Sequence, residues 1–162
     1  ALPISAGFDD RLIGAFDRRV ADVEPLGEYL AEAMPPRVMP PGQVPSYSNH
    51  GMALAGYVVE VVSGMPYERY VREEILEPLG RERSSSVQPL PPELDAHRAI
   101  PYPVNRESGS LLYMPITPAG MLSTTAHDMA RFLIAHLAGW DQPDSGARYR
   151  AADAPATVWQ PS

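Results

Sequence analysis

Tyr47, Ser48 and Asn49 form the stretch of this sequence best suited to chemistry. A tyrosine hydroxyl can transfer protons, and an asparagine two positions later can hydrogen-bond to a substrate or to neighbouring groups. On these three residues alone, the simpler interpretation is that Tyr47 packs and Asn49 caps a helix. The surroundings favour a functional role, because a proline-rich approach precedes the motif and an apolar helix follows it. We therefore place the edge of an active site here.

Lysine is absent from the sequence, because all 13 basic residues are arginine. This matters for Tyr47, since a free tyrosine titrates at about pH 10 and needs adjacent positive charge to act as a base. Arginine can supply charge, but it does not give up its proton and is a poor proton shuttle. We expect the rest of the catalytic apparatus to be missing from this chain.

The residues from 50 to 63 are predicted to form a central helix that is buried on all sides. Glu60 is its only charged residue, and apolar residues cover nearly every face. Ser48 or Asn49 can cap its start, and Gly64 marks its end. His50 is expected to be a surface residue at the start of this helix.

Apolar spacing predicts four further helices around the central one, over residues 8–20, 22–34, 65–76 and 125–138. Asp9 and Asp10 suit the positive end of the first helix dipole. Thr125 and Asp128 resemble a capping box at the start of the last helix. The buried face of that helix is predicted to consist of Met129, Phe132, Leu133 and Leu137.

Two connections are rich in proline. Residues 35–45 hold five prolines, which indicates a stiff extended segment. Residues 81–118 are predicted to be irregular, with short strand pieces at 98–104 and 110–114. Such a long loop is typical of a functional surface segment, here one that could roof a cleft. The serines at 84–86 are expected to form a loop after a helix.

Composition excludes several classes of function. The net charge is −7 and no basic stripe is present, which argues against nucleic-acid binding. No cysteine occurs, and the four histidines show no metal-ligand spacing. The longest apolar run is far too short to span a membrane. No metal and no organic cofactor is implied, and the sequence does not indicate a cellular location.

Several longer segments resemble one known family, the serine β-lactamase-related hydrolases. This family includes class C β-lactamases, D-alanyl-D-alanine carboxypeptidases and similar esterases. The resemblance lies in the order and spacing of Ala6-Gly7-Phe8, of residues 41–51 around Tyr-Ser-Asn, of residues 54–64 and 67–80, and of Pro118-Ala119-Gly120 through Phe132. It extends over nearly the whole chain to about residue 138.

The resemblance implies roles for the motif. The family uses a Ser-x-x-Lys nucleophile motif, a Tyr-x-Asn loop and a Lys/His-Thr-Gly strand, and only the second occurs here. Tyr47 would be the general base that activates the serine and later protonates the leaving group. Asn49 would bind the lysine and the substrate, with Ser48 at the variable middle position of this substrate-binding loop. The first motif would precede Ala1 and the third would follow Ser162.

We therefore expect a mainly α chain, the helical domain of a β-lactamase-like (penicillin-binding transpeptidase-like) fold with most of its sheet missing. Residues 1–140 would form this helical segment and residues 141–162 a polar tail. The parent protein would be a serine hydrolase that cleaves a small amide or ester through an acyl-enzyme, and this chain alone would be inactive. The alternative is a non-catalytic helical binding module or a degenerate family member. Apolar surface left without its sheet predicts self-association.

Overall fold

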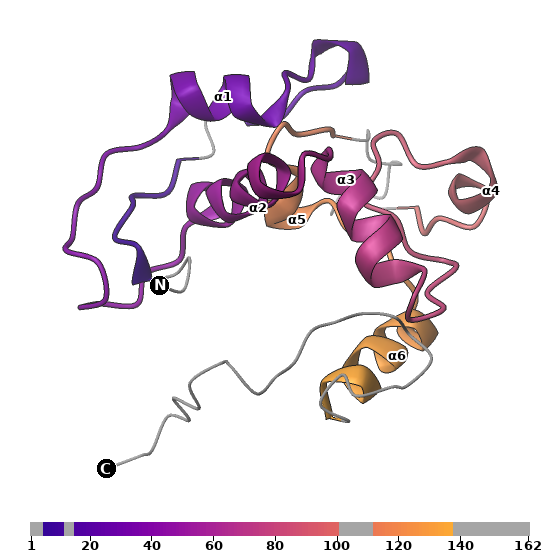
Figure 1. Ribbon diagram of the computed structural model, residues 1–162. Helices are drawn as coiled ribbons and strands as arrows, with labels where there is room; N and C mark the ends of the chain where they lie inside the picture. The colour runs from indigo at the N-terminus through magenta and orange to yellow at the C-terminus, as the bar shows by residue number, and fades with distance from the viewer. Residues whose placement is uncertain (1–4, 12–14, 101–111, 138–162) are drawn as a thin grey trace.

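The helix α2 (Asn49–Ser63) runs through the centre of the chain in the computed structural model, which describes residues 5–11, 15–100 and 112–137. Three helices pack against it, α1 (Leu26–Ala33), α3 (Tyr67–Tyr70) and α5 (Thr117–Gly120) (Figure 1). The core cluster comprises Ala15, Leu26, Tyr29, Leu30, Ala53, Met114 and Ile116. Within the described ranges the pairings between extended segments are isolated bridges, so the prediction of a mainly α chain agrees with the structure.

The start and end of α2 follow from two residues. Ser48 is the cap, since its backbone is extended and its Oγ accepts a hydrogen bond from the Gly51 N–H at 3.0 Å. Gly64 ends the helix with φ of 68°, in the left-handed region that glycine adopts most readily. Glu60 is half-buried. Its carboxylate accepts a hydrogen bond from the N–H of Tyr67, the first residue of α3, at 2.8 Å.

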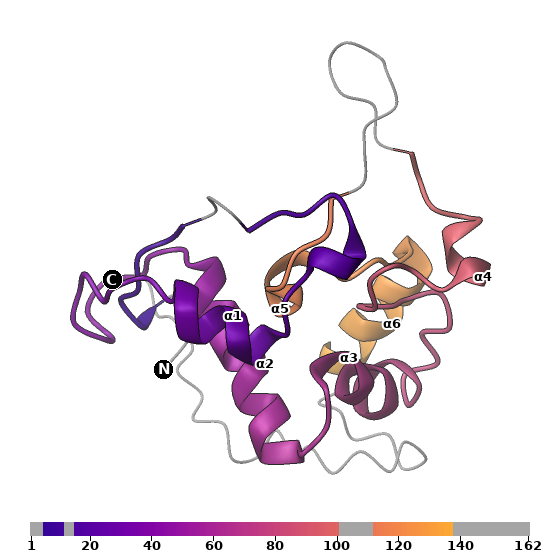
Figure 2. The same cartoon turned by 90° about the horizontal axis from the view of Figure 1, so that it is seen from above.

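The prediction that α2 is buried on all sides is wrong, most clearly in its second half. Ala53 and Gly56 face the core, whereas Val58, Val61 and Val62 are exposed, Val62 by 81%. The reason is the position of the neighbours, because the last turns of α2 extend beyond α1 and α5 (Figure 2). An apolar sequence on all faces therefore does not by itself bury a helix.

The helix predicted over 8–20 is not present in the described part of that range. Phe8 instead pairs with Arg37, and Asp17 exchanges two backbone hydrogen bonds with Tyr113, each of 2.8 Å. Only a short 3-10 turn, Val20–Asp22, follows. The backbone of this segment thus makes hydrogen bonds to distant parts of the chain rather than within itself.

The second helix, α1, begins later than predicted because Pro25 is its N-cap residue.

The predicted helix over 65–76 is present as α3 continued by a π-helical stretch, Val71–Leu76. In the described part of the segment after it, residues 77–100 and 112–120, two short helices, α4 (Pro92–Asp95) and α5, lie among irregular backbone. Of the strand pieces predicted at 98–104 and 110–114, the described residues form only the bridge at Tyr113. Residues 101–104 and 110–111 of these two pieces lie outside the described residues.

The buried face of the helix α6 (Ala126–Leu137) agrees only in part with the one predicted, since Met129 and Phe132 are half-buried. Leu133 and Leu137 are exposed, Leu137 by 89%, whereas Asp128 and Ala135 are buried.

No helix in the described ranges is both long and apolar enough to cross a bilayer. The exposed apolar residues on α2 and α6 are the surface on which the predicted self-association would depend. The tail assigned to 141–162 lies outside the described residues.

Asp128 explains the different face of α6. Its N–H does donate to Thr125 Oγ1 at 3.2 Å, which is half of the predicted capping box. Its carboxylate, however, accepts from the Arg83 N–H at 2.9 Å and from Ser84 Oγ at 2.7 Å. The serines at 84–86 follow the π-helical stretch in irregular backbone, as predicted, and they are buried. This network attaches α6 to the chain that follows α3.

Gly56 sets the distance between α2 and α5. A Cβ atom at this position would collide with the ring of Pro118, the second residue of α5. We predict that Gly56→Ala destabilises the protein by about 1–3 kcal/mol through overpacking, although alanine alone would favour the helix by about 1 kcal/mol. Urea unfolding measures the change, and Ala55→Gly on the exposed side of α2 calibrates the propensity term. A stabilised Gly56→Ala variant would contradict the close packing.

Candidate functional site

The N-terminal segment 5–11 lies alongside residues 36–42 and covers the start of α2. Gly42 N donates to Ser5 O at 2.7 Å, and Val38 N donates to Gly7 O at 2.8 Å. Gly7 has φ of 79°, and a Cβ atom there would collide with the carbonyl of Met39. The proline-rich segment is thus fixed by the N-terminal one.

The segment pairing places Asp9 and Asp10 against the motif. Ser48 Oγ, besides capping α2, donates to the backbone carbonyl of Asp9 at 3.2 Å. The Asp10 carboxylate accepts from the backbone N–H of Asn49 at 2.9 Å and from Asn49 Nδ2 at 2.8 Å. A carboxylate at this position also lies at the positive end of the α2 dipole. Ser48 and Asn49 are therefore buried and held by hydrogen bonds to the N-terminal segment.

Tyr47 and Asn49, the two ends of the motif, are brought together. The Tyr47 hydroxyl donates to Asn49 Oδ1 at 3.0 Å. Tyr47 is 66% exposed, so its ring lies on the surface rather than in the core. The packing role considered for Tyr47 does not fit this exposure. A phenol that is held at one point and open on its other sides is accessible to a reacting group.

His50 is not the surface residue that the sequence suggested, because it is fully buried. Its ring stacks on Tyr29 of α1, with the ring centroids 5.8 Å apart, and its Nε2 lies 3.4 Å from the Tyr29 hydroxyl. Its Nδ1 lies 3.9 Å from Asp10 Oδ1. Burial lowers the pKa of His50, although the charge of Asp10 opposes this effect. The imidazole is therefore neutral at neutral pH and serves as packing beneath the motif.

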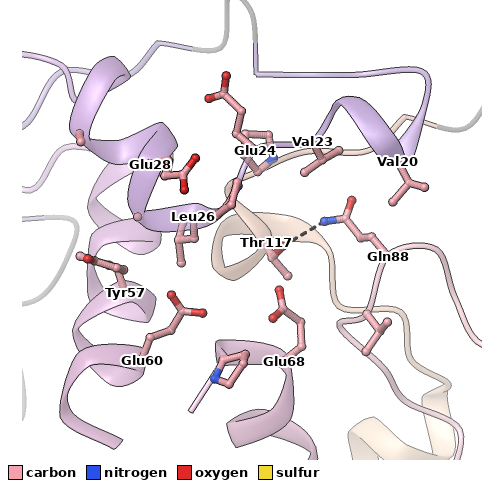
Figure 3. A pocket seen from close by; sticks show the side chains of 16 residues that line it. Val20, Val23, Glu24, Leu26, Glu28, Tyr57, Glu60, Glu68, Gln88 and Thr117 are labelled. Atoms are coloured by element: carbon pink, nitrogen blue, oxygen red, sulfur yellow. Dashed lines mark hydrogen bonds between the residues drawn. The ribbon is translucent and has the colours of Figure 1, made fainter. Parts of the chain in front are cut away.

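A large open pocket among the described residues lies elsewhere. It has a volume of about 910 Å³ and lies between the start of α1, the middle of α2 and the start of α3 (Figure 3). Four carboxylates line it, Glu24, Glu28, Glu60 and Glu68, and none of its lining residues is basic. Tyr47, Ser48 and Asn49 are not among them. We therefore base the candidate site on the hydrogen-bonded motif and not on this pocket.

The arrangement at the motif holds one exposed phenolic hydroxyl in place through a single described hydrogen bond. The Tyr47 hydroxyl is the exposed donor, and Asn49 Oδ1 is a fixed acceptor with a second lone pair. Asp10 is the residue that sequence reasoning missed, since we assigned it to the dipole of a helix that does not form. Its distance of 39 positions from Asn49 leaves no local signal in the sequence.

Comparison with known proteins decides the family. The family model described as β-lactamase matches residues 3–161. The chain belongs to the β-lactamase family. This β-lactamase-family chain is 31% identical over 133 residues to penicillin-binding protein 4 of Amycolatopsis lactamdurans, which covers 75% of the chain and 33% of that protein. It is 34% identical over 103 residues to β-lactamase-like protein 2 of Dictyostelium discoideum, which covers 60% of the chain and 18% of that protein.

A solved structure confirms that the fold is β-lactamase-like. The octameric penicillin-binding protein homologue of Pyrococcus abyssi superposes with a TM-score of 0.63 at 26% identity, over 87% of this chain and 34% of that one. The β-lactamase-family chain thus spans about a third or less of the length of these three proteins. The expected resemblance to β-lactamase-related hydrolases and penicillin-binding proteins is confirmed.

Proposed function

We propose that this chain is the Tyr-x-Asn segment of a β-lactamase-family serine hydrolase, which cleaves a small amide or ester through an acyl-enzyme. The observation that carries the proposal is the contact between the Tyr47 hydroxyl and Asn49 Oδ1 at the start of α2. This contact combines an exposed phenol with a buried, oriented amide. The family assignment supports the reaction class, since its members include β-lactamases and penicillin-binding proteins.

In the proposed reaction, a serine outside this chain attacks the substrate carbonyl and gives its proton to Tyr47. The carbon–oxygen bond to the enzyme forms, and the bond to the leaving amine or alcohol breaks as Tyr47 returns the proton. Water then hydrolyses the ester of the acyl-enzyme. Asn49 and Ser48 belong to the substrate-binding loop, and Asn49 Oδ1 has a second lone pair besides the one that accepts from Tyr47. This division of roles rests on general acid–base and nucleophilic catalysis.

We also propose that the chain is inactive when alone. Tyr47 needs a positive neighbour to act as a base, and this sequence has no lysine, no Ser-x-x-Lys and no Lys/His-Thr-Gly motif. The segment is proposed to be the helical domain of the fold, completed by a sheet and a nucleophile helix from the rest of the parent protein.

Burst kinetics test the proposed function. The full-length protein, mixed with a p-nitrophenyl ester or a chromogenic β-lactam, is expected to release one equivalent of product in a fast phase before steady turnover. The chain of residues 1–162 alone, tested in the same way, is the negative control. A full-length protein that neither turns over these substrates nor shows a burst would contradict the hydrolase proposal.

A second candidate is a non-catalytic binding module that keeps the scaffold. The observation in its favour is that the backbone nitrogen, Nδ2 and Oδ1 of Asn49 each have a hydrogen-bond partner within the chain, in Asp10 or Tyr47. The coding sequence on either side of this segment distinguishes the two candidates. If no Ser-x-x-Lys lies upstream, the enzyme proposal fails for the parent protein as well.

A further inference from the structure

The backbone nitrogen and the side-chain nitrogen of Asn49 both donate hydrogen bonds to the same carboxylate, that of Asp10. The backbone N–H donates to Asp10 Oδ1 at 2.9 Å, and the side-chain Nδ2 donates to Asp10 Oδ2 at 2.8 Å. Asn49 is buried, so water cannot readily replace these bonds. The Asp10 side chain is only 26% exposed, which shields the pair further. Asp10 thus makes a two-point clamp on Asn49.

The chemistry of the clamp fixes the orientation of the Asn49 amide. An ionised carboxylate accepts hydrogen bonds and donates none, so the NH₂ of Asn49 must face Asp10. The amide oxygen must then face the other way, where the Tyr47 hydroxyl donates to it at 3.0 Å. In the flipped orientation, Oδ1 would lie against the carboxylate and the NH₂ against the phenol. Electrostatic repulsion between the oxygens disfavours that state.

We propose that Asp10 is a positioning residue for the Tyr-x-Asn motif. Asp10 holds the Asn49 amide in the orientation in which Asn49 Oδ1 accepts a hydrogen bond from the Tyr47 hydroxyl. This inference rests on the proposed function for its catalytic consequence, but its structural part stands on the hydrogen bonds alone. Asp10 does not touch the substrate in this account. It acts through Asn49 on the place of the Tyr47 oxygen, and small displacements of a reacting group are costly in rate.

Among the described residues, Asn49 makes the short hydrogen bonds to the Asp10 carboxylate, and His50 is a more distant, charge-dependent neighbour. The Asp10 N–H donates to Asp9 Oδ1 at 2.9 Å, and His50 Nδ1 lies 3.9 Å from Asp10 Oδ1, too far for a hydrogen bond. The start of α2 adds favourable charge from its dipole. Asp9, by contrast, is exposed and its carboxylate points to the backbone of Asp10, which makes it a matched control one position away.

The first measurement uses the chain of residues 1–162. In Asp10→Asn, one of the two acceptor oxygens becomes an NH₂ group that faces a donor, so the clamp opens and the Asn49 amide can turn. We expect the Asn49 side-chain NH₂ to exchange with solvent at least about 10-fold faster by NMR, whereas Asp9→Asn leaves it unchanged. Unchanged protection of the Asn49 amide in Asp10→Asn would overturn the clamp.

The second measurement uses the full-length protein and a double-mutant cycle. Asp10→Asn is expected to lower kcat for ester hydrolysis by about 10- to 100-fold with little change in KM, from the loss of charged hydrogen bonds. In a Tyr47→Phe background the same change is expected to have almost no further effect, because Asp10 acts through the Tyr47 contact. An equal loss of kcat in both backgrounds would show a general structural role and overturn the proposal.

The two measurements separate the failure of this inference from the failure of the proposed function. If the wild-type full-length protein has no hydrolase activity but the Asn49 side-chain NH₂ exchanges faster in Asp10→Asn, the proposed function is contradicted and the clamp is supported. An active wild type whose Asp10→Asn variant keeps both its protection and its kcat sinks the inference alone. If Asp10→Asn does not fold, Asp10→Ser gives water room to accept from Asn49 and is put through the same two measurements.

Discussion

Replacing Tyr47 by Phe in the full-length protein is expected to lower the rate of acylation by about 10²- to 10⁴-fold, the usual contribution of a general base. The ring is retained and only the hydroxyl that contacts Asn49 is removed. Because Tyr47 is exposed, the loss of its single hydrogen bond is expected to cost at most about 1 kcal/mol of stability. Stopped-flow release of the leaving group measures the acylation step, and thermal unfolding measures the stability.

Tyr113→Phe is the matched control for that change, since Tyr113 is held through its backbone bonds to Asp17 and is not a partner in the described hydrogen bonds of Tyr47, Ser48 and Asn49. Its acylation rate should equal that of the wild type. An unchanged rate of ester hydrolysis in Tyr47→Phe would remove Tyr47 from the mechanism. A rate that falls together with the melting temperature would assign it to packing instead.

Replacing Asp128 by Ala is expected to cost about 3–5 kcal/mol of unfolding free energy. The change leaves the Ser84 hydroxyl and the Arg83 N–H without their acceptor. It also removes the negative charge that acts on the buried Arg81 guanidinium. Urea unfolding of the chain measures the loss. Asp95→Ala is the control, because its exposed ion pair with Arg98 should contribute no more than about 1 kcal/mol.

Asp128 also predicts how stability depends on pH. Burial alone would raise its pKa, but hydrogen bonds from Ser84 and the Arg83 N–H, with His127 and the charge of Arg81, lower it below the ordinary value. The folded state therefore binds this proton less tightly than the unfolded state. The contribution of Asp128 is complete above the unfolded pKa of about 3.9 and is lost as the pH falls below it. Asp128→Ala should lack this acid-dependent loss between about pH 5 and pH 2, and an identical pH profile would contradict the network.

The parts of the molecule that the sequence predicts are those set by neighbouring residues. The Tyr-x-Asn motif, the start of α2 at Ser48 and Asn49 and its end at Gly64 all follow from chemistry within a few positions. Local hydrogen bonds and glycine conformation decide such features, and both can be inferred from residue types.

The parts that the sequence misses depend on which distant segments meet. Asp10 reaches Asn49 across 39 positions, and Asp128 reaches Ser84 across 44. His50 is polar, and its burial requires the ring of Tyr29 to cover it. The outer valines of α2 are apolar, yet no neighbouring helix extends far enough to cover them. Tertiary contacts override the local pattern in each case.

Intact-mass analysis after treatment with a fluorophosphonate or a β-lactam tests most directly whether the full-length protein is a serine hydrolase with its nucleophile outside this chain. We predict a covalent adduct on the full-length protein, a much slower adduct on its Tyr47→Phe variant, and none on the chain of residues 1–162. An adduct on the isolated chain would reveal a nucleophile within it and contradict the assignment of the nucleophile to another part of the protein. Absence of an adduct on the full-length protein would contradict the hydrolase itself and favour the binding module.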